Sequence, residues 1–263
     1  MIKLKRWKEK NKIISMEGNT RWYSIEGTGD WVPSVTSVLS VIDKGEHFLK
    51  WVASHASYDI ACQVRDAAAE RGTIVHDIAE DLMKGEEVLV KDYGPEIIKR
   101  VMCFEKWWNE TNPEIIAIEE MLAYPGIRFA GRFDIIARIN NKNVLIDIKT
   151  GGYYKTHDLQ ASCYKILWDT IMEQCGYGKE YYIDELRGLY LGDRWIKGPN
   201  PQYKQLKFLG REVEGAVNLW HWTNSDGRGN PPRPFKKRKL PSSFKFKTTK
   251  EKKEIMDEPE QYL

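Results

Sequence analysis

Residues 131–152 read GRFDIIARINNKNVLIDIKTGG, and this stretch decides the fold. Two strand-like runs, residues 128–139 and 144–149, flank a tight polar turn at residues 140–143, a pattern typical of a β-hairpin. Side chains alternate along a strand, so Asp147 and Lys149 share one face while Ile146 and Ile148 point to the core. The short turn is expected to bring Asp134 next to Asp147.

This placement of charges predicts a metal site. Two carboxylates a few ångströms apart repel each other, and proteins tolerate them mainly where a cation lies between them. A lysine beside that cation can orient a water molecule and stabilise charge on an oxyanion. An isolated D-x-K sequence would more often be a surface ion pair, but Asp134 distinguishes this one. The set of Asp134, Asp147 and Lys149 suits hydrolysis of a phosphodiester.

The sequence around the hairpin predicts alternating blocks of helix and strand. Apolar residues at three- and four-residue steps predict helices at about residues 33–42, 46–57, 58–84, 95–109, 157–175 and 206–222. Further strands are predicted at residues 115–123, 185–191 and 195–197, with a short N-terminal hairpin that turns near Gly27 and Gly29. This order predicts an α/β core with an added helical layer.

Composition excludes several classes of protein. The chain has 263 residues, of which 41% are hydrophobic and 30% charged, enough for a sizeable core. It contains no apolar run of about 18 residues, and its basic N-terminus lacks the apolar stretch of a signal peptide. We therefore expect a cytoplasmic protein without a membrane span. The four cysteines (Cys62, Cys103, Cys163 and Cys175) form no C-x-x-C pair and are expected to be reduced thiols.

The net charge of +3 conceals an acidic body and a basic tail. Residues 233–253 contain ten Lys or Arg and one Glu, which leaves 31 basic and 37 acidic residues elsewhere. Phenylalanines are interleaved with these lysines, which favours contact with nucleic acid over a merely solubilising terminus. We predict a domain at residues 1–224, with a helical part at 32–110 and a catalytic core at 114–222. Residues 225–263 are predicted to be a flexible tail that touches DNA through Lys236, Lys237, Arg238 and Lys239.

Over residues 32–170 the chain resembles the PD-(D/E)xK nucleases in their RecB-like exonuclease branch. Asp134 matches the G-x-x-D carboxylate of that family, as GRFD, and Asp147 and Lys149 match its hydrophobic-D-x-K-T strand, as LIDIKTG. Gln160 and Tyr164 match its Q-x-x-x-Y helix, as QASCY, and their spacing puts both on one helical face.

The resemblance extends upstream of the hairpin. His76 matches the histidine of the G-x-x-x-H helix, as GTIVH, and PSVTSVL is similar to the N-terminal element of phage and mitochondrial genome-maintenance exonucleases. Glu119 fits the acidic residue that ends the preceding strand, although Glu120 is an equal candidate. Arg132 would contact phosphate or pair with a carboxylate.

The resemblance implies a restriction-endonuclease-like fold, with a central mixed β-sheet flanked by helices and an N-terminal helical layer. It implies a DNA exonuclease with one or two Mg²⁺ or Mn²⁺ ions, held by His76, Asp134, Asp147 and the carbonyl of Ile148. Lys149 would position the water. Glu119 would supply an acid, Gln160 would steer the lysine or a phosphate, and Tyr164 would stack on a base.

Several points stay open at this level. The substrate would be single-stranded DNA or duplex ends, in phage or bacterial DNA repair, recombination or replication. Some relatives carry an iron–sulfur cluster on a C-terminal cysteine trio, which this chain lacks, so no cluster is expected. No phosphate-binding loop of a motor is present in the sequence, so a helicase, like a recombinase or single-strand-binding protein, would be a separate partner. The alternatives are an endonuclease of the same fold and a non-catalytic DNA-binding module. Cleavage polarity and oligomeric state are not predicted.

Overall fold

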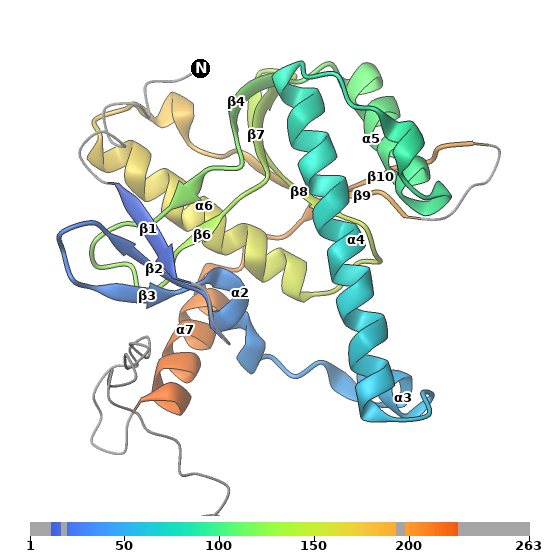
Figure 1. The fold of residues 1–263 in the computed structure, drawn as a ribbon. Coiled ribbons are helices and arrows are strands. Elements are labelled where there is room, and N and C mark those ends of the chain that lie inside the picture. The colour runs from blue at the N-terminus through green and yellow to red at the C-terminus, as the bar shows by residue number, and fades with distance from the viewer. Residues whose placement is uncertain (1–11, 17–19, 193–197, 226–263) are drawn as a thin grey trace, which may run out of the picture.

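The computed structural model describes residues 12–16, 20–192 and 198–225. At its centre is a five-stranded sheet with the order β10-β9-β8-β7-β4 (Figure 1). Strands β8 and β9 pair in parallel and all other neighbours pair antiparallel, so the sheet is mixed. Its strands are β4 (Glu114–Ile118), β7 (Ile135–Ile139), β8 (Lys142–Lys149), β9 (Glu185–Tyr190) and β10 (Gln202–Leu206).

Helices cover both faces of the sheet. On one face lie α4 (Tyr58–Lys84) and α5 (Pro95–Thr111), while α6 (Thr156–Gln174) lies on the other, with α7 (Gly210–Asn224) packed against it. Side-chain alternation separates two cores, because Ile135 and Ile146 join the α4–α5 core whereas Ile136 and Leu145 join the α6–α7 core. The predicted fold class, a mixed sheet between helical layers, is confirmed.

The N-terminal part adds a small second sheet. Strands β1 (Ile13–Met16), β2 (Trp22–Ile25) and β3 (Trp31–Pro33) pair antiparallel in that order. The β2–β3 turn contains the predicted glycines, Gly27 and Gly29, whose φ angles are 87° and 73°. Strand β1 was not expected. The chain then continues through α2 (Val35–Val38), the 3₁₀ turn η1 (Leu39–Val41) and α3 (Gly45–Ala53).

Helix ends follow local capping signals. Helix α4 begins after Ser57, whose hydroxyl accepts a hydrogen bond from the Ile60 N–H, and it ends at Gly85 with φ 80°. Its bounds are those expected from the sequence. Helix α2 is shorter than expected, because the chain tightens into η1 after one turn capped by Ser34. Two further 3₁₀ turns are η2 (Val90–Asp92) and η3 (Lys179–Tyr181).

Besides α2 and α3, which are shorter than expected, three predicted elements differ from the structure. The strand predicted at residues 115–123 ends at Ile118, and the one at 128–139 is broken before Ile135. Short strands β5 (Met121–Leu122) and β6 (Gly131–Arg132) pair in a separate two-stranded sheet. The last helix begins at Gly210 rather than residue 206, because residues 202–206 pair with β9. The strand predicted at 195–197 lies outside the described residues, as does most of the tail.

No helix in the described part of the chain combines the length and the apolar character that crossing a membrane requires.

Candidate active site

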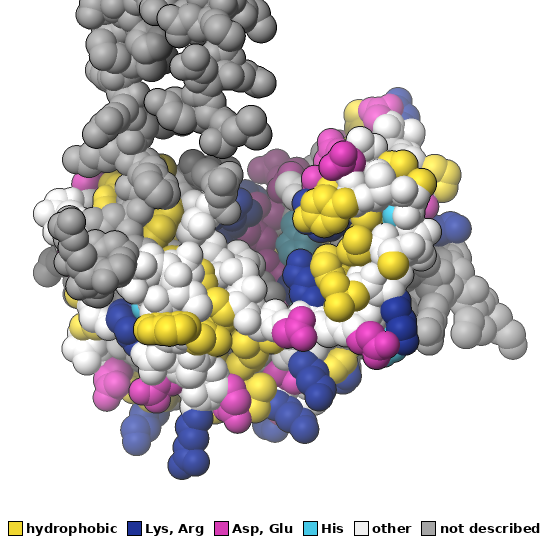
Figure 2. Space-filling model, turned by 90° about the horizontal axis from the view of Figure 1, so that it is seen from below, with side chains coloured by type: hydrophobic (Ala, Val, Ile, Leu, Met, Phe, Trp, Pro, Cys, Tyr) yellow, Lys and Arg dark blue, Asp and Glu magenta, His cyan; other side chains and the backbone are white. Residues whose placement is uncertain are grey.

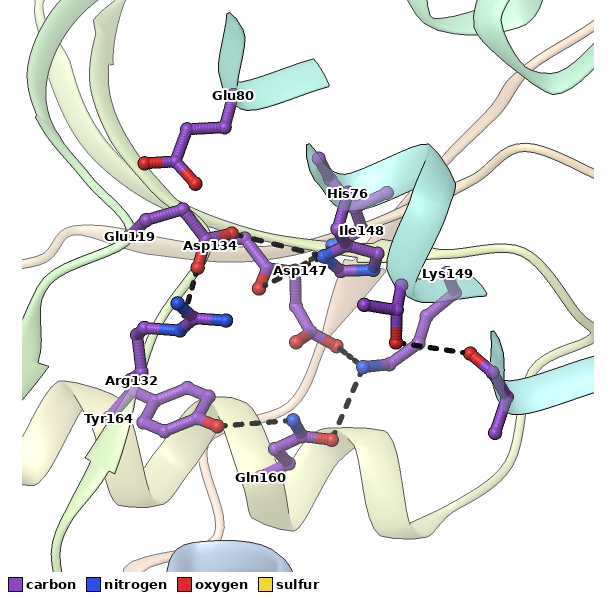
Figure 3. Close-up of polar contacts among 12 residues, drawn as sticks. His76, Glu80, Glu119, Arg132, Asp134, Asp147, Ile148, Lys149, Gln160 and Tyr164 are labelled. Carbon is purple, nitrogen blue, oxygen red and sulfur yellow. Dashed lines mark hydrogen bonds and ion pairs between the residues drawn. The ribbon is translucent and has the colours of Figure 1, made fainter. Parts of the chain in front are cut away.

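The β7–β8 hairpin brings two buried carboxylates together. Its turn consists of Asn140 and Asn141, both at positive φ, a geometry that matches the twist of a two-residue hairpin. Asp134 immediately precedes β7, and its Oδ2 accepts a 2.6 Å hydrogen bond from the Ile148 N–H on β8. Asp134 is 9% exposed and Asp147 is 1% exposed. The predicted juxtaposition of the two aspartates is therefore present (Figure 3).

Asp147 is a buried carboxylate with few neighbouring groups that stabilise its negative charge. The Lys149 ammonium is its close partner, with Nζ 2.5 Å from Asp147 Oδ2, and no other group in the described structure donates a hydrogen bond to either oxygen. Burial, with the Asp134 charge adding to it, raises the pKa of Asp147 to about 6. A buried carboxylate with a single cationic partner and a second carboxylate beside it is suited to receive a further cation.

Glu119 joins the acidic cluster from a turn in which its backbone has a left-handed conformation. It follows β4 with φ 48°, a left-handed conformation that is costly for a residue with a side chain. Its N–H donates to the Asp134 carbonyl at 2.8 Å, which holds this turn against the hairpin. Burial raises the pKa of Glu119, and Arg132 Nε lies 2.9 Å from its Oε2. Of the two candidates at this point, Glu119 rather than Glu120 is the one in the cluster.

His76 reaches the same cluster from the other side, on α4. Its Nδ1 lies 3.5 Å from Asp134 Oδ1 and 3.9 Å from Glu119 Oε1. Burial alone would lower the pKa of His76, but the two carboxylates outweigh it and raise the pKa to about 10. One ligand atom each from His76, Glu119 and Asp134 lies within 4.8 Å of the others.

These side chains fit a divalent ion. Carboxylate oxygens suit Mg²⁺ or Mn²⁺, and one imidazole is acceptable to Mn²⁺. The observed cluster adds Glu119 to the predicted metal ligands. The carboxylate of Asp147 lies next to this cluster, beside Asp134. The main chain of Ile148 is engaged there through its N–H, and its carbonyl as a ligand stays a prediction.

A polar chain links the end of β8 to α6. Lys149 Nζ donates to Gln160 Oε1 at 3.3 Å, and Gln160 Nε2 donates to the Tyr164 hydroxyl at 3.2 Å (Figure 3). The i, i+4 spacing of Gln160 and Tyr164 makes this chain possible, as expected. Tyr164 is only 4% exposed, and a Cβ added to Gly131 would lie 2.7 Å from its ring. Tyr164 nevertheless lines the cavity described below, so its stacking on a base stays a prediction, while its hydroxyl accepts from Gln160.

The cluster opens into a cavity of about 470 Å³. Its walls come from α4, the N-terminal sheet, α2, β6 and α6, and include His76, Glu119, Asp134, Lys149 and Arg132. Arg132 is about half exposed while it pairs with Glu119, so its outer edge faces this cavity. Seen from below, the surface is hollowed between the α3–α4 lobe and the α7 side, with acidic and histidine side chains in the depth (Figure 2).

Two supporting residues were not anticipated from the sequence. Gly72 lets α4 approach the end of β8, because a Cβ there would lie 3.3 Å from Thr150 Oγ1. Arg100 on α5 is 8% exposed and donates to the carbonyls of Glu96, at 2.9 Å, and Thr150, at 3.4 Å. Its position on the apolar face of α5 was the available signal, since a charge there needs buried partners. The predicted tail contacts Lys236, Lys237, Arg238 and Lys239 lie outside the described residues.

Comparison with known proteins gives a family. The model of the PD-(D/E)XK nuclease superfamily matches residues 49–194, which is more than half of the chain. A search of curated proteins found no match. Among solved structures, the protein SSO0001 is 15% identical with a TM-score of 0.36, covering 73% of this chain and 76% of that one. An alkaline exonuclease from Laribacter hongkongensis is 16% identical with a TM-score of 0.30, covering 71% of this chain and 84% of that one.

Proposed function

Because the chain belongs to the PD-(D/E)XK nuclease superfamily, we propose that it is a DNA exonuclease that hydrolyses phosphodiester bonds with Mg²⁺ or Mn²⁺. The observation that supports this most directly is the buried carboxylate of Asp147, which lies beside a second carboxylate, Asp134, and has the Lys149 ammonium as its close partner. A structural ion pair alone would not require a second carboxylate, a glutamate and a histidine around it.

Each side chain has a defined part in this proposal. His76, Glu119, Asp134 and Asp147 would hold one or two ions. When bound, the metal polarises the scissile phosphate and lowers the pKa of a water molecule. Lys149 is held between Asp147 and Gln160, so its ammonium is oriented before the substrate arrives. It would stabilise the charge that develops on the phosphate oxygens. Arg132 holds the Glu119 carboxylate through an ion pair, and the exposed edge of its guanidinium would contact the phosphate backbone of the DNA strand.

Exonuclease action is favoured over endonuclease action by the order of the motifs, with the helical histidine upstream of the catalytic hairpin. We place the enzyme in bacterial or phage DNA repair, recombination or replication, in the cytoplasm of the cell or infected host. A helicase, recombinase or single-strand-binding protein would act as a separate chain.

The test is a time course on end-labelled linear single-stranded DNA, linear duplex and closed circular DNA with Mg²⁺, Mn²⁺ or EDTA. We expect metal-dependent release of short products from linear DNA only. Asp147→Asn is expected to be inactive while it keeps its fold. Cleavage of the circles would favour the endonuclease alternative. DNA binding without any cleavage by the wild-type protein would leave the non-catalytic module as the better description.

The basic tail gives this proposal a separate measurement. Deleting residues 233–263 should weaken DNA binding and make its salt dependence shallower, by about 0.7–0.9 in log–log slope for each phosphate that the tail no longer neutralises. Turnover at saturating DNA should be nearly unchanged if the tail acts as a tether. A large loss of turnover at saturation would show instead that this segment contributes to the catalytic site.

A further inference from the structure

A second cavity lies on the other side of the catalytic lysine. It measures about 380 Å³, and its described walls include Thr150, Gly151, Gly152, Tyr153 and Tyr190. Lys149 lines the first cavity and the next residue, Thr150, lines the second, so both cavities are bordered by the end of β8. A DNA strand that binds at the carboxylate cluster and passes the end of β8 would reach this second cavity.

The register of the sheet connects this cavity to the site. In parallel and antiparallel ladders alike, directly paired residues point to the same face. Asp147 pairs with Gly188, which in turn pairs with Lys204, and Lys149 pairs with Tyr190. These side chains therefore lie on one face of β8, β9 and β10. The sheet face that carries Asp147 and Lys149 therefore extends across β9 and β10 to an aromatic residue, Tyr190, and a basic residue, Lys204.

Gly188 makes this surface possible. A Cβ at this position would lie 2.6 Å from the ring of Tyr190, closer than real side chains approach. Tyr190 therefore lies across β9 at Gly188, in the row next to Asp147 and Lys149. Its pKa is raised by burial and by the negative charge of Asp147, which agrees with this closeness.

Two further side chains, His157 and Lys204, pack against the two tyrosines of this wall. His157, in the first turn of α6, stacks on Tyr190 with ring centroids 5.8 Å apart, and its Nδ1 lies 3.0 Å from the Tyr190 hydroxyl. The Tyr153 hydroxyl donates to Asp158 at 2.6 Å, which fixes its ring. Lys204 Nζ lies 3.2 Å from the centre of the Tyr153 ring, so a positive charge and an aromatic face meet at the mouth.

We propose that this cavity, lined by Tyr153 and Tyr190 and flanked by His157 and Lys204, is a stacking subsite for one unpaired base of the DNA strand next to the scissile phosphate. Tyr153 would offer its face to the base, and Lys204 would turn from the ring to the adjoining phosphate. The exposed main chain of Gly151 and Gly152 leaves room for the sugar, because a Cβ at either position would meet nothing within 4 Å.

The size and the lining of this cavity both fit a single unpaired nucleotide. A volume of about 380 Å³ lies at the low end of pockets that hold one small molecule, which suits a single nucleotide and not a base pair. Aromatic rings with a nearby cation are how proteins hold single strands without reading sequence. The inference rests on the proposed nuclease function and sharpens it, because the substrate next to the cut would have to be single-stranded.

The experiment uses single-stranded oligonucleotides that carry one abasic residue, with fully based oligonucleotides as the reference. Wild-type protein is compared with Tyr153→Leu, which removes the ring, and with Tyr153→Phe, which keeps the ring and removes only the hydroxyl. Trp222→Leu, which changes an aromatic residue 72% exposed on α7, is the matched control. Binding is measured by fluorescence anisotropy with Ca²⁺, and cleavage by the product ladder with Mn²⁺.

We expect the abasic residue to weaken wild-type binding by about 5- to 150-fold and to cause one pause as it reaches the subsite. Tyr153→Leu should raise KM and lose both the penalty and the pause, whereas Tyr153→Phe and Trp222→Leu should keep them. An abasic penalty in Tyr153→Leu equal to that of the wild type would overturn the inference. So would an equal loss in Tyr153→Phe, which would assign the effect to the Asp158 hydrogen bond.

A second variant and a binding measurement that does not depend on cleavage complete the experiment. If Tyr153→Leu fails to fold, Lys204→Gln carries the test, because removing its charge from the phosphate should reduce the salt slope for single strands by about 0.7. An unchanged slope would refute the inference. If wild-type protein cuts no DNA with either metal, the proposed function fails. The anisotropy measurements still report whether an unpaired base is bound.

Discussion

Two histidines on opposite sides of Lys149 show how differently the two regions are built. Burial pushes the pKa of both downward, and the charge of Lys149 adds to that effect. His76 faces Asp134 and Glu119, whose charges reverse the effect and raise its pKa to about 10. His157 is packed among tyrosines, and its pKa falls to about 4.

The comparison separates a region built for charge from one built for contact. At neutral pH His76 carries a proton that a metal ion must displace, whereas His157 is already neutral. The first region can exchange a proton for a cation, and the second can offer uncharged aromatic surface. Burial alone therefore does not predict the behaviour of a histidine; the neighbouring carboxylates decide it.

The largest expected effect comes from the residue between the two regions. Lys149→Met should lower turnover by about 10²–10³ with metal binding largely retained, because the ammonium acts on the phosphate and is not a ligand. Single-turnover cleavage and calorimetric Mn²⁺ titration measure the two properties. Lys142→Met, at the exposed start of the same strand, is the control. Activity within a few-fold of the wild type would contradict the assignment of the catalytic strand.

The next prediction concerns the proton on His76. Metal binding must displace it, so Mn²⁺ affinity should rise up to about tenfold per pH unit from pH 7 toward pH 9. Calorimetry in buffers of different ionisation enthalpy should show about one proton released per bound ion. His76→Gln should bind more weakly and lose this release, and excess Mn²⁺ should partly restore its activity. His157→Gln should release as many protons as the wild type; a loss there would break the contrast between the two histidines.

A smaller effect distinguishes two buried aspartates. Asp147 has only the Lys149 ammonium against it and lies beside the Asp134 charge, whereas Asp158 accepts from the Tyr153 hydroxyl at 2.6 Å and the Lys207 N–H at 3.1 Å. In EDTA at pH 8, Asp147→Asn should raise the free energy of unfolding by on the order of 1–3 kcal/mol, because a destabilised charge is removed. Asp158→Asn should lower it by about 1–2 kcal/mol. Urea denaturation measures both, and a loss of stability in both variants would contradict the account of Asp147.

The smallest effect is a pH dependence of stability without metal. The pKa of His157 is depressed, so its contribution is complete above about pH 6.5 and is lost as the pH falls toward 4. The pKa of Asp147 is raised, so its contribution is present below about pH 4 and is lost as the pH rises through 6. Measured in an Asp147→Asn background, His157→Gln should flatten the fall below pH 6.5, by on the order of 1 kcal/mol. An unchanged slope would mean that His157 is not buried neutral.

Local signals in the sequence were sufficient for several elements. Helix α4 has a serine cap and a terminal glycine within its own turns, so its bounds follow from neighbouring residues alone. The β7–β8 hairpin likewise follows from a two-residue turn, and that turn places Asp134 beside Asp147. Strand β10 was missed because residues 202–206 have little apolar pattern and become a strand only by pairing with β9.

The candidate site divides in the same way. Asp134, Asp147, Lys149, Gln160 and His76 could be identified in the sequence because each belongs to a short motif. Glu119 could not be separated from Glu120 by position, because the choice depends on a left-handed turn held by the Asp134 carbonyl. The close packing of the Tyr164 ring at Gly131 likewise could not be read from the sequence, because the two residues lie on separate elements.

By itself, the sequence determined the chemistry available to this protein: two aspartates, a lysine and a histidine in motifs whose spacing is local. Their charge states depend on the folded arrangement, which surrounds His76 with carboxylates and His157 with rings, and buries Asp147 between Asp134 and Lys149. The physical reason is range. Backbone periodicity and capping act over a few residues. A pKa and a binding surface depend on groups brought together from distant parts of the chain, such as α4 with β4 or Gly188 with Lys204.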